Sequence, residues 1–351
     1  MTQPVKLIAA TLCLFLACVQ LKAEQSTKTI EKTFPREGIE ELSLSNTSGK
    51  MEITQTDGDE ITVVVTMKVI AKTGVKADET LEAIRLNETR AGNYLNLETQ
   101  LAKNMQLKQF LTTTNVSVDY VVSVPRGIRL RLVSTDGSIF LGNFAGDLNV
   151  DVRNGDFKAA TLSGGELYVK QSGGTFAVED VAWINGDFKD CKIRIEDATE
   201  AILTTSSCDG KIETCEKIGI RSSGGVLKLG EIGELAGSSS FTKYEVQDIA
   251  HVLDMDMKFG EMNIRHIRRT FSEIRLKGSF TKAGLTFASD GGYHLELKRN
   301  KSLKPDLPRG MVLEERPAAE RNMFIGTKFV GNTNYSGKVF LELSNGSLYI
   351  Q

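Results

Sequence analysis

The feature that most constrains the fold is a repeat of short β-like segments between residues 134 and 298. Two of its units are "STDGSIFLGNFAGDLNVDV" (134–152) and "RNGDFKAATLSGGELYVKQ" (153–171). Most units open with small or polar turn residues and continue with a short alternating segment. A unit of about 20 residues cannot bury its own apolar face, whereas stacked units share one continuous core. The repeat therefore predicts a β-solenoid, or β-helix-like, fold.

The flanking residues predict further β structure, so the expected class is all-β. Residues 24–133 hold alternating segments and one amphipathic stretch at 77–88, which predicts an N-terminal β region with one helix. Residues 299–322 hold three of the six prolines and are typical of a loop. Residues 323–351 resume strands, which we expect to cap the solenoid repeats of 134–298. The chain has 32 glycines and few prolines, as a hydrogen-bonded ladder with tight turns requires.

The N-terminus, "MTQPVKLIAATLCLFLACVQLKAEQ", has a basic residue followed by a short apolar run. This pattern is typical of a secretory signal peptide, so we expect residues 1–23 to be removed by cleavage between Ala23 and Glu24. The alternative is a lipid anchor on Cys18, because "FLAC" approximates a lipobox. Either way we expect an exported protein of the periplasm, the cell surface or the medium. No later stretch is apolar enough to predict a transmembrane segment in the mature chain.

Three cysteines follow the predicted signal peptide, so at most one internal disulfide can form. Cys191 and Cys208 are its candidates, and the alternative is that both are small buried hydrophobic side chains. The cysteine spacings match no zinc pattern. A formal net charge of -2 over 351 residues predicts no nucleic-acid partner. The remaining candidates are a surface ligand, a glycan or an envelope protein.

The tetrapeptide Asn-Gly-Asp-Phe occurs twice, at 154–157 and 185–188. Asp156 and Asp187 could form a pair of catalytic acids, as in enzymes that cleave polysaccharides. Aspartate beside glycine is also what a tight turn requires. We favour the turn interpretation, in which both copies mark one recurring corner and the following phenylalanines point into the core.

No motif predicts a cofactor or a metal ion. The glycine pairs form neither a G-x-G-x-x-G nor a G-x-x-x-x-G-K-[ST] pattern, and His251, His266 and His294 are isolated in strand-like segments. The basic cluster "RHIRR" (265–269) could form a positive stripe for an anionic glycan. We favour the alternative, a solvated strand face. We therefore expect no catalytic residue, no cofactor and no metal.

Three stretches carry a family resemblance: "LSLSNTSGKMEITQTDGDEITVVV" (42–65), "VDYVVSVPRGIRLRLVSTDGSIFLGNFAGDLNVDVRNGDFKAATL" (118–162) and "KFGEMNIRHI" (258–267). The chain resembles an adhesin family of exported bacterial β-strand-repeat proteins that is common in the Bacteroidetes. The resemblance covers nearly the whole mature chain and implies a β-solenoid on an exported protein. It implies no particular functional residue.

These observations predict an exported, non-enzymatic adhesin-like or scaffold protein of the bacterial cell envelope that binds through an extended solenoid surface. The alternative is a carbohydrate-active β-helix enzyme that acts on a polysaccharide. Three or more charged side chains that converge in a groove on one face would favour the enzyme. A flat face without such convergence would exclude it.

Overall fold

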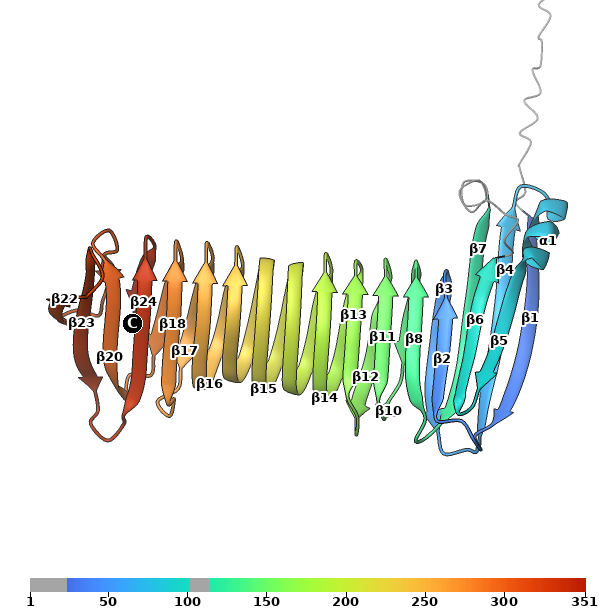
Figure 1. Ribbon diagram of the computed structural model, residues 1–351, viewed down its shortest axis with the longest axis horizontal. Helices are drawn as coiled ribbons and strands as arrows, with labels where there is room; N and C mark the ends of the chain where they lie inside the picture. The colour runs from blue at the N-terminus through green and yellow to red at the C-terminus, as the bar shows by residue number, and fades with distance from the viewer. Residues whose placement is uncertain (1–23, 102–113) are drawn as a thin grey trace, which may run out of the picture.

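The computed structural model describes residues 24–101 and 114–351 and shows a long stack of β-strands with one helix at its N-terminal end (Figure 1). Within these residues, all 25 strands belong to a single hydrogen-bonded sheet. The predicted all-β class with one helix is therefore confirmed.

The middle of the stack consists of two rows of parallel strands, and the chain passes alternately through one row and the other. We call one pass through both rows a layer. The first row contains β8 (Arg129–Thr135), β11 (Leu148–Arg153), β13 (Leu167–Ser172) and β18 (Glu273–Ser279). The second row contains β9 (Gly137–Leu141), β12 (Phe157–Ser163), β17 (Glu261–Ile267) and β19 (Lys282–Phe287), with β10 (Phe144–Ala145) beside it. The long strands that run through both rows are β14 (Thr175–Lys189), β15 (Lys192–Ser240) and β16 (Lys243–Lys258).

Register between layers is set by the length of the repeat, which changes slightly from one layer to the next. Along the second row, Phe157 pairs with Ile139 on one side and with Phe176 on the other. Ile184 pairs with Leu167 inside the first row, so the second Asn-Gly-Asp-Phe copy lies within a first-row strand. The two Asn-Gly-Asp-Phe copies consequently occupy different places in the layer and do not mark one recurring corner.

The core lies between the rows, where side chains alternate between buried and exposed along each strand. Phe157 of the second row and Phe188 of the first row are both fully buried, as predicted. They do not contact each other directly. Each packs against Phe176, with ring centroids 5.4 Å and 5.0 Å away. Such pairs stabilise a fold by about 0.5–1.5 kcal/mol beyond the area they bury.

The parallel stack begins well before residue 134. β2 (Glu41–Asn46) and β3 (Gly49–Thr56) pair in parallel with β8 and β9, and on their other side with β6 (Tyr94–Leu101) and β7 (Asn115–Pro125). Residues 41–56 thus form one layer of the stack. The strands on both sides of this layer come from residues that follow later in the sequence. The predicted boundary at 133/134 divides this end of the stack, because apolar alternation alone does not reveal which strands pair.

The N-terminal end is closed by antiparallel strands and the helix. β5 (Ile84–Ala91) pairs with β6, while β4 (Glu60–Ala71) pairs with β7 and with β1 (Glu24–Pro35). The helix α1 (Gly74–Ala83) packs against β1 and β4, and its N-cap Thr73 accepts a hydrogen bond from the backbone N–H of Lys76. The predicted helix at 77–88 is therefore displaced. Pairing with β6 extends the chain from Ile84 onward.

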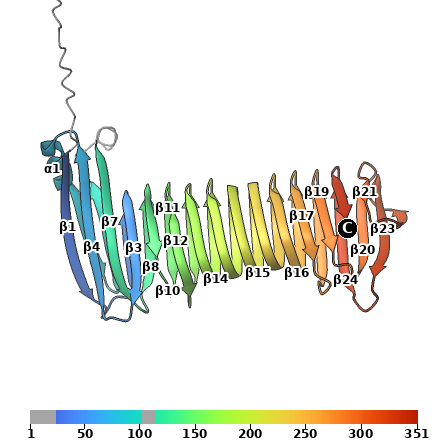
Figure 2. The ribbon, with the colours of Figure 1, turned by 180° about the vertical axis from the view of Figure 1, so that it is seen from behind.

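The C-terminal end also has an inserted layer (Figure 2). β24 (Gly337–Ser344) lies between β18 and β20 (Gly292–Asn300), and β25 (Ser347–Ile350) lies between β19 and β21 (Pro305–Asp306). β23 (Met323–Gly331) then pairs antiparallel with β20 and with β22 (Glu314–Pro317). Of the strands in the expected cap at 323–351, β23 lies beyond β20, whereas β24 and β25 lie between earlier strands. The predicted loop at 299–322 contains β21 and β22.

Candidate functional site

Each layer in the middle of the stack turns from the first row to the second at a residue with positive φ. The registers of the preceding strands align these residues, which we call the corner column. The column consists of Asp136, Asn154, Gly173, Asp190, Ser207, Gly224, Phe241, Phe259, Phe280 and Asn345. Glycine, asparagine and aspartate suit such a turn, because they adopt left-handed backbone at low cost. Three successive phenylalanines do not.

We call Phe241, Phe259 and Phe280 the phenylalanine ladder. Their φ angles are 55°, 51° and 53°, a conformation that is rare for a bulky side chain. The side chains remain 65%, 49% and 53% exposed. Neighbouring rings stack with centroids 5.0 Å apart and planes within 7° and 11° of parallel. The ladder therefore places a rigid strip of hydrocarbon on a corner where turn chemistry favours polar or small residues.

In the stretch "KFGE" (258–261), turn chemistry favours a small or polar residue at the corner. Phe259 is itself the turn residue and points outward. A sequence signal did exist, since "SFTK" occurs at 240–243 and again at 279–282. Its phenylalanine stands where other layers have Asn, Asp or Gly. Layer lengths vary, however, so the column becomes visible only once the strands are paired.

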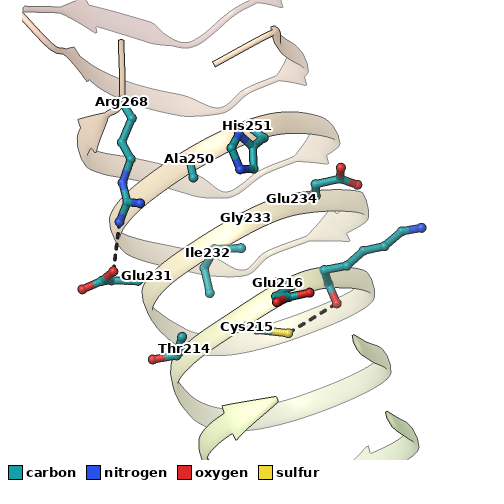
Figure 3. A pocket seen from close by; sticks show the side chains of 11 residues that line it. Thr214, Cys215, Glu216, Glu231, Ile232, Gly233, Glu234, Ala250, His251 and Arg268 are labelled. Atoms are coloured by element: carbon teal, nitrogen blue, oxygen red, sulfur yellow. Dashed lines mark hydrogen bonds and ion pairs between the residues drawn. The ribbon is translucent and has the colours of Figure 1, made fainter. Parts of the chain in front are cut away.

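A hollow of about 490 Å³ lies at the opposite turn, between the second row and the first row of the next layer (Figure 3). Gly233 belongs to its floor, and a Cβ there would lie 2.4 Å from the Glu216 carbonyl oxygen of the preceding layer. Glu216, Glu231 and Glu234 lie around it on neighbouring layers. Charged side chains therefore line this hollow, with Glu231 turned toward Arg268 on one side and Glu234 extending from the other (Figure 3).

The basic cluster 265–269 lies beside this hollow, and most of its charge is paired. Arg268 contacts Glu231 at 2.9 Å and the largely buried Asp248 at 2.5 Å. The ring of His266 lies 2.6 Å from the same aspartate. The two other arginines also have partners: Arg265 donates to Gln247, and Arg269 pairs with Asp290. The cluster is therefore held by local partners and does not form the positive stripe that we considered for an anionic glycan.

Asp156 and Asp187 do not converge. Asp156 precedes β12 and accepts a hydrogen bond from the backbone N–H of Thr175 in the next layer, at 2.9 Å. Asp187 lies on the first-row half of β14, with Lys170 and Thr204 as its register neighbours. The first aspartate thus has a structural role between layers, and the second is exposed on the other row. Over residues 24–101 and 114–351, no group of three His, Cys, Asp or Glu side chains could hold a metal ion.

The three cysteines in the described part of the chain are buried free thiols. Cys191 and Cys208 lie on successive layers with sulfurs 3.6 Å apart, and each is the hydrogen-bond partner of the other. This shared bond lowers the pKa of Cys208 to about 7 and raises that of Cys191. Cys215 stands apart and donates to the Lys217 carbonyl (Figure 3), and burial raises its pKa to about 11. The structure thus brings together the two cysteines that we considered for a disulfide.

The predicted processing sites fall at the edge of the described chain. Ala23 and Cys18 lie outside the described residues, and Glu24 is the first residue of β1. In the part that the structure describes, no helix has the length and apolar character needed to cross a membrane.

Comparisons with known proteins leave the family open. No family model matches the chain, and no curated protein matches it. Among solved structures, a "putative adhesin" from Bacteroides fragilis is 15% identical over 73% of this chain and 97% of its own, with a TM-score of 0.33. A "putative lipid binding protein" from Parabacteroides distasonis is 12% identical over 73% and 94%, with a TM-score of 0.35. A "putative cell adhesion protein" from Clostridium sporogenes is 12% identical over 93% and 99%, with a TM-score of 0.20. Likeness this distant assigns no function to the chain.

Proposed function

We propose that this chain is an exported β-solenoid of a bacterial cell envelope, and that it acts as an adhesin-like binding protein. Its ligand is a surface glycan or an envelope protein, held by the long side of the stack without chemical change. The parallel register between successive layers supports the solenoid assignment. The signal-like residues 1–23 support export. The family resemblance in sequence supports both.

The observation that carries the binding role is the phenylalanine ladder. Left-handed backbone costs a non-glycine residue roughly 1–2 kcal/mol, and three such residues expose apolar rings to solvent in adjacent layers. Exposed backbone outliers and contiguous apolar patches are both typical of functional surfaces. Aromatic side chains also dominate binding energy at interfaces, because they bury a large area with little loss of side-chain entropy. The ladder is accordingly the surface that we assign to ligand contact.

The test replaces the ladder with the residue that other layers use at the same corner. In a Phe241→Asn, Phe259→Asn and Phe280→Asn variant, left-handed turns become easier while the apolar strip disappears. We expect the mature chain to bind targets on an array of glycans and matrix proteins, and the variant to lose that binding with its melting temperature nearly unchanged. Equal binding by both chains, or no binding by either, would contradict the proposal.

The second candidate is the carbohydrate-active enzyme, because Glu216, Glu231 and Glu234 gather around one hollow. Paired carboxyl groups are the usual catalysts of glycoside hydrolysis. Arg268 neutralises Glu231, which leaves Glu216 and Glu234 as the candidate acid and base. A Glu216→Gln and Glu234→Gln variant tests this role. An enzyme would release new reducing ends from polysaccharide, and the variant would not.

A further inference from the structure

A second hollow, of about 710 Å³, lies on the outer face of the second row. It extends along the stack over six successive layers, from Lys158 to Glu245, or roughly 24 Å at about 4.8 Å per layer. We propose that this basic groove binds an acidic polysaccharide that lies along the stack. The inference rests on the proposed function and names the class of ligand.

The charge of the groove is strongly one-sided. Two acidic residues, Asp209 and Glu245, contribute to its wall. The basic residues of the wall are Lys158, Lys192, Arg194, Lys211, Lys228 and Lys243. Since the whole chain has a formal net charge of only -2, this excess of positive charge is local. A local excess of charge of one sign along a concave surface attracts ligands of the opposite charge.

Three of the basic residues lie side by side on adjacent strands. Arg194, Lys211 and Lys228 are evenly spaced in the sequence. The same spacing separates register partners at both ends of β15, where Arg194 pairs with Ala177 and Lys228 pairs with Glu245. Their side chains therefore project from adjacent strands about 4.8 Å apart. Like charges that face each other across neighbouring strands destabilise a sheet. A ladder of cations is thus a feature that the fold alone does not favour.

Two basic residues of the groove are neutralised by an acid two residues away on the same strand. Lys211 pairs with Glu213 in this way, and Lys243 pairs with Glu245 at 2.9 Å. By contrast, the side chains of Lys192 and Arg194 make no hydrogen bond or ion pair with the described residues, and Lys228 interacts only electrostatically with Glu245, which lies opposite it in register. These three exposed side chains can therefore contact an anionic ligand.

A short side chain, Ala177, lies among the long cationic side chains of the groove. Gly210 also lines the groove but occupies a core position, because a Cβ there would point inward and lie 2.6 Å from the buried Leu227 side chain. The space of the groove therefore lies above Ala177, between walls that carry the charge.

The shape and chemistry of the groove favour a polysaccharide over other polyanions. An extended chain with a carboxylate on each sugar matches cations that recur in every layer from Lys192 to Lys228. The lining has no aromatic side chain on which nucleic-acid bases could stack. Lys243 at one end lies two residues from Phe241, so a long ligand can continue from the groove toward the phenylalanine ladder.

The test uses the mature chain, residues 24–351, with polygalacturonate as the acidic probe and dextran as the neutral one. The groove variant carries Lys192→Glu, Arg194→Glu and Lys228→Glu. The matched control carries Lys28→Glu, Arg131→Glu and Lys301→Glu, three exposed cations outside the groove. Melting temperatures show whether each chain is folded.

We expect the mature chain to bind polygalacturonate but not dextran, with affinity that falls as salt is added. The groove variant should lose roughly a hundredfold in affinity, and the control less than about threefold. Equal losses in both variants, unchanged binding by the groove variant, or preference for single-stranded DNA would overturn the inference. Array binding that depends on the phenylalanine ladder while the groove variant behaves as the mature chain would overturn the groove assignment alone.

Discussion

Phe157 illustrates how single side chains hold successive layers together. Its ring is fully buried and stacks on Phe176 of the next layer. We expect Phe157→Ala to lower the free energy of unfolding by about 3–5 kcal/mol, because it leaves a cavity between layers. Asp156→Ala should cost only about 1 kcal/mol, since it removes one partly buried hydrogen bond to Thr175. Urea unfolding followed by circular dichroism measures both changes. Equal losses would contradict this account of the core.

Glycines at corners are required for two separable reasons, conformation and space. Gly225 has a φ of +91°, and a Cβ there would lie 1.9 Å from the Cys208 carbonyl oxygen. Gly92 also has positive φ but has no atom within 4 Å of such a Cβ. We expect Gly92→Ala to cost about 1 kcal/mol from backbone strain alone. Gly225→Ala should cost distinctly more in the same unfolding assay, and a similar cost at both positions would contradict the packing argument.

The paired cysteines predict a pH-dependent oxidation. With the pKa of Cys208 lowered to about 7, its thiolate fraction rises between pH 6 and pH 8. We expect oxidised glutathione to join Cys191 and Cys208 of the mature chain, residues 24–351, faster across that range, leaving Cys215 as its single thiol. Alkylation in denaturant followed by intact mass should then find one modified cysteine, and three after reduction. Three modified cysteines before reduction would contradict the prediction.

Residues in the core were more predictable from sequence than residues on the corner. The burial of Phe157 and Phe188 follows from alternation along a strand, which is a local pattern. The phenylalanine ladder depends on which residues stack in register, and the register step differs between layers: Met262 is farther in sequence from its partner Ala283 than Phe176 is from Ile193. Local turn rules would place polar residues there. The phenylalanine ladder, our candidate for ligand contact, therefore lies where the local turn rules fail.

At the scale of elements, the order of the strands along the sequence does not reveal the inserted layers. β24 and β25 each pair with strands on both sides, whereas β1 pairs with β4 alone among the strands that the structure describes. The alternation of apolar and polar residues predicts strands at both ends of the chain. It does not reveal that the C-terminal strands lie inside the stack. Partner choice depends on contacts between residues far apart in sequence.

This arrangement predicts unequal effects of two deletions. Removing residues 337–351 leaves unpaired edges on β18 and β20, so we expect a large fall in melting temperature and aggregation through those edges. Removing residues 24–35 exposes one edge at the end of the stack and should have a smaller effect. Thermal unfolding with light scattering compares the two chains. A milder effect from the C-terminal deletion would contradict the inserted layer.

On the scale of the whole molecule, the two proposed binding features adjoin on one long side. The basic groove occupies the middle layers, and the phenylalanine ladder continues from its last layer toward the C-terminal end. A rigid stack holds these features at fixed spacing, as an extended ligand would require. The all-β class and the one helix were predictable from period and composition. The proposed ligand-binding side was not, because it is assembled from residues one layer apart.

The claim that this molecule binds and does not transform its ligand is tested most directly by recovering that ligand. Polygalacturonate is retained on immobilised mature chain, eluted with salt, and compared in chain length with the starting material. The account predicts that it binds, elutes intact and carries no new reducing ends. Shortened polysaccharide, produced at a rate that falls in the Glu216→Gln and Glu234→Gln variant, would contradict this account. The protein would then be an enzyme.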